Sequence, residues 1–140
     1  MRTIFALGAL ALLSACASTP DTESADPVTA AWTEHAGASR DRVVFPQLQA
    51  WKPLEDDWIA VRTRADDYFL LRLESACASD LRFSSSLSLA IRQSSRNVLS
   101  RFDRVLVGDR SCRIQEIRPV DADAVVEDLA GQDIREPFVR

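Results

Sequence analysis

The stretch that decides the fold is DWIAVRTRADDYFLLRL at residues 57–73. On either side of Arg64-Ala65-Asp66, apolar side chains recur at every second position: Ile59 and Val61 before it, and Phe69, Leu71 and Leu73 after it. This period of two is typical of β-strands with one buried face. Pairing Val61 with Phe69 places the inner residues of both runs on the same face. The stretch therefore predicts an antiparallel hairpin with a three-residue loop, whose register is fixed by burial.

Two further regions are expected to be strands. In residues 86–92, leucine or isoleucine alternates with serine or alanine. We expect two strands joined by a turn at residues 94–97, because serine and asparagine favour turns. A helix is the alternative, because the apolar residues of segment 87–105 also recur near a helical period. Residues 104–107 and 112–117 form another predicted hairpin, with residues 108–111 as its loop.

The remaining segments complete a small, mainly β fold. Ile114 and Ile117 fall on opposite faces of the last strand, which therefore needs a bulge or burial on both sides. Asp121 is a candidate N-cap for a short helix that ends at Gly131. We expect an edge segment at residues 43–45, a turn at residues 52–56, a loop after Cys77 and a loose C-terminal tail. The fold class predicted is a small antiparallel sheet or barrel-like β domain with one disulfide and a short C-terminal helix.

The first 15 residues have the parts of a secretory signal: a positively charged start, an apolar run and small residues before a cysteine. The apolar run is too short to cross a bilayer as a helix. Leu13-Ser14-Ala15-Cys16 resembles the lipobox of bacterial lipoproteins, and this resemblance implies cleavage before Cys16 and acylation of Cys16, with palmitate among the expected chains. The alternative is an ordinary signal peptide that is cut near Ala15 or Ala17. Because Ala17 is not aspartate, the resemblance implies an outer-membrane location that faces the periplasm.

Residues 16–41 are rich in Ser, Thr, Pro and Asp and have few large apolar groups. Such a composition buries too little surface to offset the entropy of ordering, so we expect a flexible tether. His35, the only histidine, lies in this segment and is expected to be a solvated side chain. The sequence thus predicts four parts: a lipoprotein signal peptide at 1–15, the tether at 16–41, a β-rich domain at 42–120, and a short helix with a tail at 121–140.

Two cysteines remain after Cys16, namely Cys77 and Cys112. Export places them in an oxidising compartment, which favours a disulfide between them; buried free thiols or a metal pair are the alternatives. Two thiolates without a partner histidine do not make a structural zinc site, so no metal is predicted.

From Phe45 to about Pro119 the chain resembles DUF6491, a family of small proteobacterial lipoproteins that is defined only as a domain of unknown function. The matching features are Trp51, Tyr68, Leu70-Leu71, Leu73, Cys77 followed by Leu81, the Phe102-Asp103-Arg104 triplet, and Val105 to Val107 leading into Cys112. The resemblance implies an exported, disulfide-linked, β-rich domain and supplies no catalytic residues. The glycines that are frequent in the family's middle turn are replaced here by Ser94-Ser95-Arg96-Asn97.

No catalytic set is apparent in the sequence. The serines at 84–86 have no evident base, and both late cysteines are expected to be paired. Carboxylate pairs occur at 56–57, 66–67, 127–128 and at Asp121 with Asp123, which keeps a carboxylate-pair hydrolase as an alternative function. Solvated turn and cap residues account for them more simply. We therefore predict no enzyme and no cofactor.

Charge is unevenly distributed along the chain. Segment 81–118 holds eight arginines and three acidic residues, a net charge of +5, whereas residues 16–80 have a net charge of −6 and residues 119–140 one of −4. This pattern indicates either salt bridges within the protein or a basic face for anionic envelope material, such as lipid phosphates. The candidate anion-binding residues are Arg92, Arg96, Arg101 and Arg104.

These observations predict a membrane-anchored envelope lipoprotein whose specific role is unknown and which acts as a non-catalytic binding or structural module. The expected partners are the lipid bilayer, through acylated Cys16, and an envelope protein or anionic lipid. Nucleic acid is not expected as a partner, because proteins that bind it are usually basic and this chain has a net charge of −4.

Overall fold

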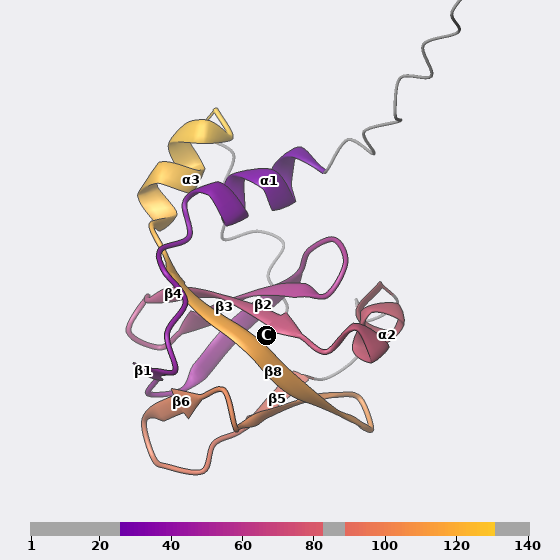
Figure 1. Cartoon of the computed structure of the whole chain (residues 1–140). Coiled ribbons are helices and arrows are strands. Elements are labelled where there is room, and N and C mark those ends of the chain that lie inside the picture. The colour runs from indigo at the N-terminus through magenta and orange to yellow at the C-terminus, as the bar shows by residue number, and fades with distance from the viewer. Residues whose placement is uncertain (1–25, 83–88, 131–140) are drawn as a thin grey trace, which may run out of the picture.

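The structure is a computed structural model that describes residues 26–82 and 89–130 (Figure 1). The order of its elements is α1 (Pro27–Glu34), β1 (Arg42–Val44), β2 (Leu48–Pro53), β3 (Trp58–Thr63), β4 (Tyr68–Leu73), the 3-10 helix η1 (Ser75–Cys77), α2 (Ala78–Arg82), β5 (Leu89–Arg92), β6 (Val98–Ser100), β7 (Arg104–Val107), β8 (Arg110–Val120) and α3 (Ala122–Asp128). The predicted mainly β fold with a short C-terminal helix is confirmed.

Six strands form one antiparallel sheet in the order β2-β3-β4-β8-β7-β5, while β1 and β6 form a separate two-stranded sheet. The edge strands β2 and β5 approach each other, so that the larger sheet is nearly closed. Figure 1 shows β8 crossing the molecule diagonally, from the β7 hairpin up to α3. The barrel-like alternative within the predicted fold class is therefore the one observed.

The predicted hairpin is present with the predicted register. Val61 lies opposite Phe69 in the β3–β4 ladder. The buried side chain of Thr63 accepts hydrogen bonds from the backbone amides of Ala65 and Asp67, at 3.3 and 3.2 Å. These hydrogen bonds satisfy two backbone amides of the loop. The Thr63 side chain therefore stabilises the loop in addition to the pairing of the two strands.

The bulge expected in the last strand is also present. Arg72 pairs with Glu116 but Leu73 pairs with Ile114, so one residue of β8 is extra. The extra residue changes the alternation of side chains. As a result, Ile114 and Ile117 both join the same buried core.

The β7–β8 hairpin is confirmed, but its loop is shorter than predicted. Val107 pairs with Arg110, which leaves Gly108-Asp109 as a two-residue loop in place of residues 108–111. Gly108 has φ 58°, a left-handed conformation that glycine adopts without a steric penalty. Because the chain reverses so tightly, Arg110 and Ser111 extend β8 instead of belonging to the loop.

Residues 89–100 contain two strands, β5 and β6. The helical alternative for segment 87–105 is therefore wrong over the residues that the structure describes. Residues 83–88 lie outside the described residues. β5 pairs with β7, whereas β6 pairs with β1. Gln93 joins the two sheets, because its side-chain amide donates to the carbonyl oxygens of Phe45 and Val98, at 2.9 and 3.2 Å.

Two local expectations before and after the first hairpin are wrong. The turn expected at residues 52–56 begins later, because β2 runs to Pro53; a proline is tolerated there because β2 is an edge strand. The loop expected after Cys77 is the short helix α2, which buries Leu81 in the main core.

The flexible tether expected at residues 16–41 is wrong from Asp26 onward, and residues 16–25 lie outside the described part of the chain. Asp26 caps α1 by accepting from the backbone amide of Thr29 at 3.0 Å, and Pro27 opens the helix. Trp32 is completely buried. Average composition failed here because a single aspartate-proline cap and one large aromatic are enough to dock a short helix.

The described residues form two hydrophobic cores. The larger one fills the inside of the sheet and includes Phe45, Trp51 and Phe69. In the smaller one, which lies on the outside of the sheet, the side chains of α1 and α3 pack on β4; Trp32, Val125 and Leu70 belong to it.

The predicted start of the C-terminal helix is confirmed. The side chain of Asp121 accepts from the backbone amide of Ala124 at 3.2 Å and so caps α3. The expected end at Gly131 and the tail beyond it lie outside the described residues.

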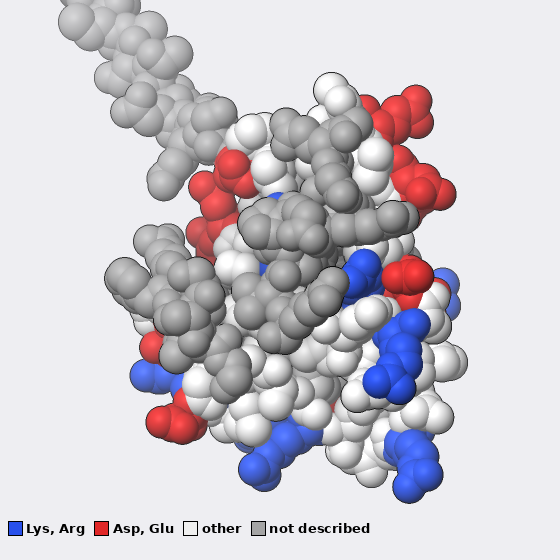
Figure 2. Space-filling model, turned by 180° about the vertical axis from the view of Figure 1, so that it is seen from behind, with Lys and Arg blue, Asp and Glu red and all other residues white. Residues whose placement is uncertain are grey.

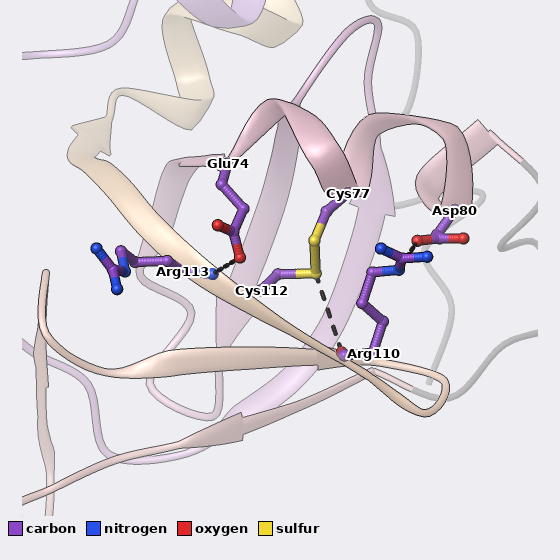
Figure 3. The surroundings of a disulfide bond; sticks show 6 residues. All are labelled: Glu74, Cys77, Asp80, Arg110, Cys112 and Arg113. Atoms are coloured by element: carbon purple, nitrogen blue, oxygen red, sulfur yellow. Dashed lines mark hydrogen bonds and ion pairs between the residues drawn. A yellow bond between two sulfur atoms is a disulfide. The ribbon is translucent and has the colours of Figure 1, made fainter.

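A disulfide joins Cys77 and Cys112, as predicted, so the free-thiol and metal-pair alternatives are excluded (Figure 3). Both cysteines are buried, and the bond fixes η1 to β8 near the start of the strand. By the chain-entropy model, closing a loop of 35 residues stabilises a fold by roughly 4 kcal/mol.

We predict that Trp32→Ala destabilises the protein by about 3–5 kcal/mol, because it removes the largest side chain of the smaller core, on the outside of the sheet. Urea unfolding of the variant measures this loss. Glu34→Gln, an exposed change on the same helix, is the control and should alter the free energy of unfolding by less than about 0.5 kcal/mol. Equal stability of the two variants would show that α1 does not pack on the sheet.

Candidate functional site

Three arginines stand in a row across neighbouring strands. In the sheet register, Arg92 of β5 lies opposite Arg104 of β7, and Arg104 lies opposite Arg113 of β8. Directly opposed residues of antiparallel strands point to the same face. All three residues are exposed. The outer face of β5, β7 and β8 therefore presents three guanidinium groups side by side, and we call this set the arginine row.

The arginine row is not neutralised by the described residues. None of its members takes part in the salt bridges of residues 26–82 and 89–130, although Arg101 pairs with Asp41 at 2.8 Å and Arg110 pairs with Asp80. Figure 3 shows Glu74 beside Arg113, but a carboxylate oxygen of Glu74 accepts from the backbone amide of Arg113, at 2.9 Å. Like charges directly opposite each other destabilise a sheet, so the row lowers the stability of the pairing between these strands.

A buried aspartate holds the turn beside the row. One carboxylate oxygen of Asp103 accepts from the backbone amide and the hydroxyl of Ser94, and the other accepts from the backbone amide of Ser100 at 2.7 Å. Asp103 is only 2% exposed. These bonds fix the chain between β5 and β7, so the direction of the neighbouring side chains is set before any ligand binds.

The same hydrogen bonds determine the charge of Asp103. Burial raises the pKa of this carboxyl, but the hydrogen bonds from Ser94 and Ser100 together outweigh burial and lower the pKa below its ordinary value. Asp103 is therefore a carboxylate at neutral pH. Because its oxygens face these donors, its charge stabilises the turn and not the arginine row.

Phe102 projects from this turn into solvent. It is 80% exposed, and its backbone amide donates to the hydroxyl of Ser100 at 3.3 Å. A second exposed apolar residue, Val44, lies on β1, the partner strand of β6, and is 72% exposed. Beside Phe102 lies a shallow depression of about 230 Å³, which is lined by Arg92, Gln93, Ser94, Phe102, Asp103 and Arg104. Apolar and cationic groups thus share this part of the surface.

The four arginines predicted to bind anions have different surroundings in the structure. It brings Arg92 and Arg104 together in the row, and it places Arg96 in the exposed turn between β5 and β6. Arg101 is paired with Asp41, so it is not a free cation. Arg113 was not among the predicted residues. The predicted β7–β8 loop was two residues too long, and a loop of that length would pair Arg104 with a residue other than Arg113.

A larger cavity lies at the other end of β8 and is acidic. Its volume is about 450 Å³, and the residues that line it are Asp66, Asp67, Tyr68, Phe69, Pro119, Val120, Asp121, Ala122, Asp123 and Val126. The fold thus gathers two of the carboxylate pairs noted in the sequence. Asp66 pairs with Arg62 at 3.8 Å and Asp121 caps α3, so Asp67 and Asp123 are the two whose carboxylates make no such bond in the described structure.

Other chemistry-bearing residues lie apart from these sites. The Nε2 atom of His35 is 3.5 Å from a carboxylate oxygen of Asp128, so the histidine expected to be solvated on a tether instead contacts α3. Within the described ranges, no group of three or more His, Cys, Asp or Glu side chains could hold a metal ion. Cys16, the predicted lipidation site, is outside these ranges.

The two charged features lie toward different ends of the molecule. Figure 2 shows acidic side chains gathered mainly around the end that carries the helices, and basic side chains mainly toward the opposite end. On the face that Figure 2 shows, the charge segregation seen along the sequence is therefore retained. Such separation of charge orients the protein toward an anionic partner, because the partner is attracted to one end and repelled by the other.

Comparison with known proteins identifies a family. The model of a family of unknown function, DUF6491, matches residues 1–135. No curated protein and no solved structure matches the chain. In the part of the chain that the structure describes, no helix has the length and apolar character needed to span a membrane.

We predict that Asp103→Asn lowers the free energy of unfolding by about 1.5–3 kcal/mol at neutral pH, because it removes a charged acceptor of several hydrogen bonds. A carboxyl whose folded pKa is lowered stabilises the fold above its unfolded pKa of about 3.9, and this stabilisation is lost as the pH falls through the folded pKa. The difference between wild type and variant should therefore shrink below about pH 4 in urea titrations. Asp109→Asn, in the exposed β7–β8 loop, is the control; a difference that is independent of pH would contradict the prediction.

Proposed function

The chain belongs to DUF6491, a family of unknown function, and we propose that it is an exported lipoprotein whose folded domain acts by binding and not by catalysis. In this proposal Cys16 carries the acyl chains, and the domain stands on the periplasmic face of the outer membrane. The proposal is made of two parts, an anchor and a binding domain, and each has its own support.

The anchor is supported by the N-terminal sequence and by the disulfide. Leu13-Ser14-Ala15-Cys16 follows a charged and then apolar start, as in lipoprotein signals. The Cys77–Cys112 disulfide is the kind of bond that forms and persists in exported proteins. Two or more acyl chains give an anchor that does not readily leave a bilayer, since each buried methylene contributes about 0.8 kcal/mol.

The length of chain before the fold is compatible with a domain held close to the membrane. Helix α1 is capped by Asp26, so the chain from the anchor to the start of the fold has ten residues, 16–25, with Cys16 counted as the first. Ten residues span at most about 35 Å when fully extended. The domain would therefore meet partners within about one domain diameter of the bilayer.

The binding role rests on one observation, the arginine row. Arg92, Arg104 and Arg113 are exposed and aligned, and no described carboxylate forms a salt bridge with them. Guanidinium groups recognise phosphates and carboxylates through paired hydrogen bonds, which makes them suited to the anionic material of an envelope. A stable sheet that maintains such a row favours an external anion as its partner.

A carboxylate-pair hydrolase is the second candidate function, and the acidic cavity is the observation that favours it. The cavity gathers Asp67 and Asp123 beside Tyr68. Two carboxyl groups across a cavity are the arrangement that glycoside hydrolysis uses, one as acid and the other as base or nucleophile. The other two carboxylates of the cavity have structural partners, so any catalytic pair would be Asp67 and Asp123.

We predict that Cys16→Ser releases the protein from membranes into the soluble envelope fraction. Metabolic labelling with a fatty-acid analogue should mark the wild-type protein and leave the variant unlabelled. Cys77→Ser is the matched control, because it removes a cysteine that the proposal assigns to the disulfide and should leave labelling intact. An unlabelled wild-type protein would refute the anchor.

The binding proposal also predicts that the protein does not cleave the cell wall. Wild type and the double variant Asp67→Asn/Asp123→Asn should release equal and background amounts of soluble sugar from purified peptidoglycan sacculi. Release by the wild type that the double variant loses would favour the hydrolase instead. Asp109→Asn provides the control for a change of charge away from the cavity.

A further inference from the structure

We propose that the arginine row and Phe102 together form a docking surface for an anionic lipid bilayer, in which the negative charge of many phosphate groups is not balanced by cationic head groups. The docking surface consists of three cationic side chains and one aromatic ring, namely Arg92, Arg104, Arg113 and Phe102. This inference deepens the binding role proposed above and rests on it, but it does not depend on the lipid anchor.

The charge of the docking surface fits several phosphates at once. Neighbouring strands lie about 4.8 Å apart, so the three guanidinium groups of β5, β7 and β8 extend over about 10 Å. Each can form a bidentate pair with a phosphate, which lysine does not reproduce. A row of this width matches a plane that carries many phosphate groups better than it matches one isolated anion.

Phe102 distinguishes a lipid surface from a soluble anionic polymer. The ring is 80% exposed, and it lines the same depression as Arg92 and Arg104. At a bilayer, such an apolar group enters the boundary between head groups and acyl chains while the cations remain at the phosphates. A polysaccharide can cover at most one face of the ring with a sugar, whereas a bilayer can bury the whole ring, so the combination favours lipid.

The rest of the turn is arranged so that it does not oppose this docking. Asp103 is next to the ring, but its carboxylate is buried and bonded to Ser94 and Ser100. Asp41 is paired with Arg101. Acidic side chains gather mainly around the end that carries the helices (Figure 2), and Figure 1 shows β5, the strand of Arg92, at the opposite end of the molecule from α1 and α3. An anionic bilayer would therefore attract this end selectively and orient the domain.

The experiment is vesicle flotation of the mature chain, residues 16–140, with Cys16→Ser so that no acyl chain contributes. This chain contains both hydrophobic cores and the disulfide. The probes are vesicles of phosphatidylcholine alone and vesicles of an equal mixture of phosphatidylcholine and phosphatidylglycerol. The protein should float with the mixed vesicles only, and added salt should weaken its binding because it screens the arginines. Equal recovery with both kinds of vesicle, or none with either, would overturn the proposal.

The double variant Arg92→Gln/Arg104→Gln should bind the mixed vesicles about 25-fold more weakly, since each basic residue near an anionic surface contributes about a fivefold change in partitioning. Its matched control is Arg40→Gln/Arg64→Gln, which removes the same charge from exposed positions outside the docking surface and should cost far less. A midpoint of urea unfolding that is no lower than that of the wild type, in each variant, verifies folding. Equal losses in the two double variants would overturn the docking surface and leave only a general effect of charge.

Phe102→Ala tests the apolar part of the proposal. It should reduce flotation with mixed vesicles at low and at high salt, because burial of the ring is not screened. Flotation that persists unchanged in this variant, or that inorganic phosphate abolishes at constant ionic strength, would overturn bilayer docking and indicate a site for a free anion. Because the tested chain carries no lipid, either result leaves the Cys16 anchor as a separate question, which labelling answers.

Discussion

The pairing of β8 with two different strands is the constraint on which the rest of the structure depends. The first part of β8 pairs with β7 and the rest pairs with β4, and the bulge in the β4–β8 ladder keeps Ile114 and Ile117 in one core. The disulfide fixes the same strand, near its start, to η1. Both candidate sites follow from this arrangement, because Arg113 lies near the start of β8 and Pro119 and Val120 line the acidic cavity at its end.

Local alternation and turn chemistry were sufficient to predict the parts of the fold that depend on neighbouring residues. The β3–β4 register followed from burial of Val61 and Phe69 on one face, and the bulge followed from the spacing of Ile114 and Ile117. Helix α1 could not be found in this way, because its stability comes from burying Trp32 against a sheet that is distant in sequence. A composition average measures the segment alone and not the surface that receives it.

The sequence was sufficient to predict that a basic site exists, but not which arginines form it. The excess of arginine in segment 81–118 indicated a basic face, and Arg92 and Arg104 belong to it. Removing Arg101 from the set required the knowledge that Asp41 lies beside it, and adding Arg113 required the true length of the β7–β8 loop. The role of Asp103 was equally hidden, since the sequence does not distinguish a buried carboxylate in a turn from a solvated one.

A structural explanation for the arginine row would be protection of a sheet edge, since charged side chains discourage edge-to-edge association. That explanation covers Arg92, because β5 is an edge strand, but it does not cover Arg104 and Arg113, whose strands β7 and β8 have partners on both sides. Two inner strands that place like charges opposite each other oppose their own pairing. The disulfide and the hydrogen bonds of Asp103 hold this arrangement in place, so a ligand would meet a surface that is already ordered and would lose little binding free energy to ordering it.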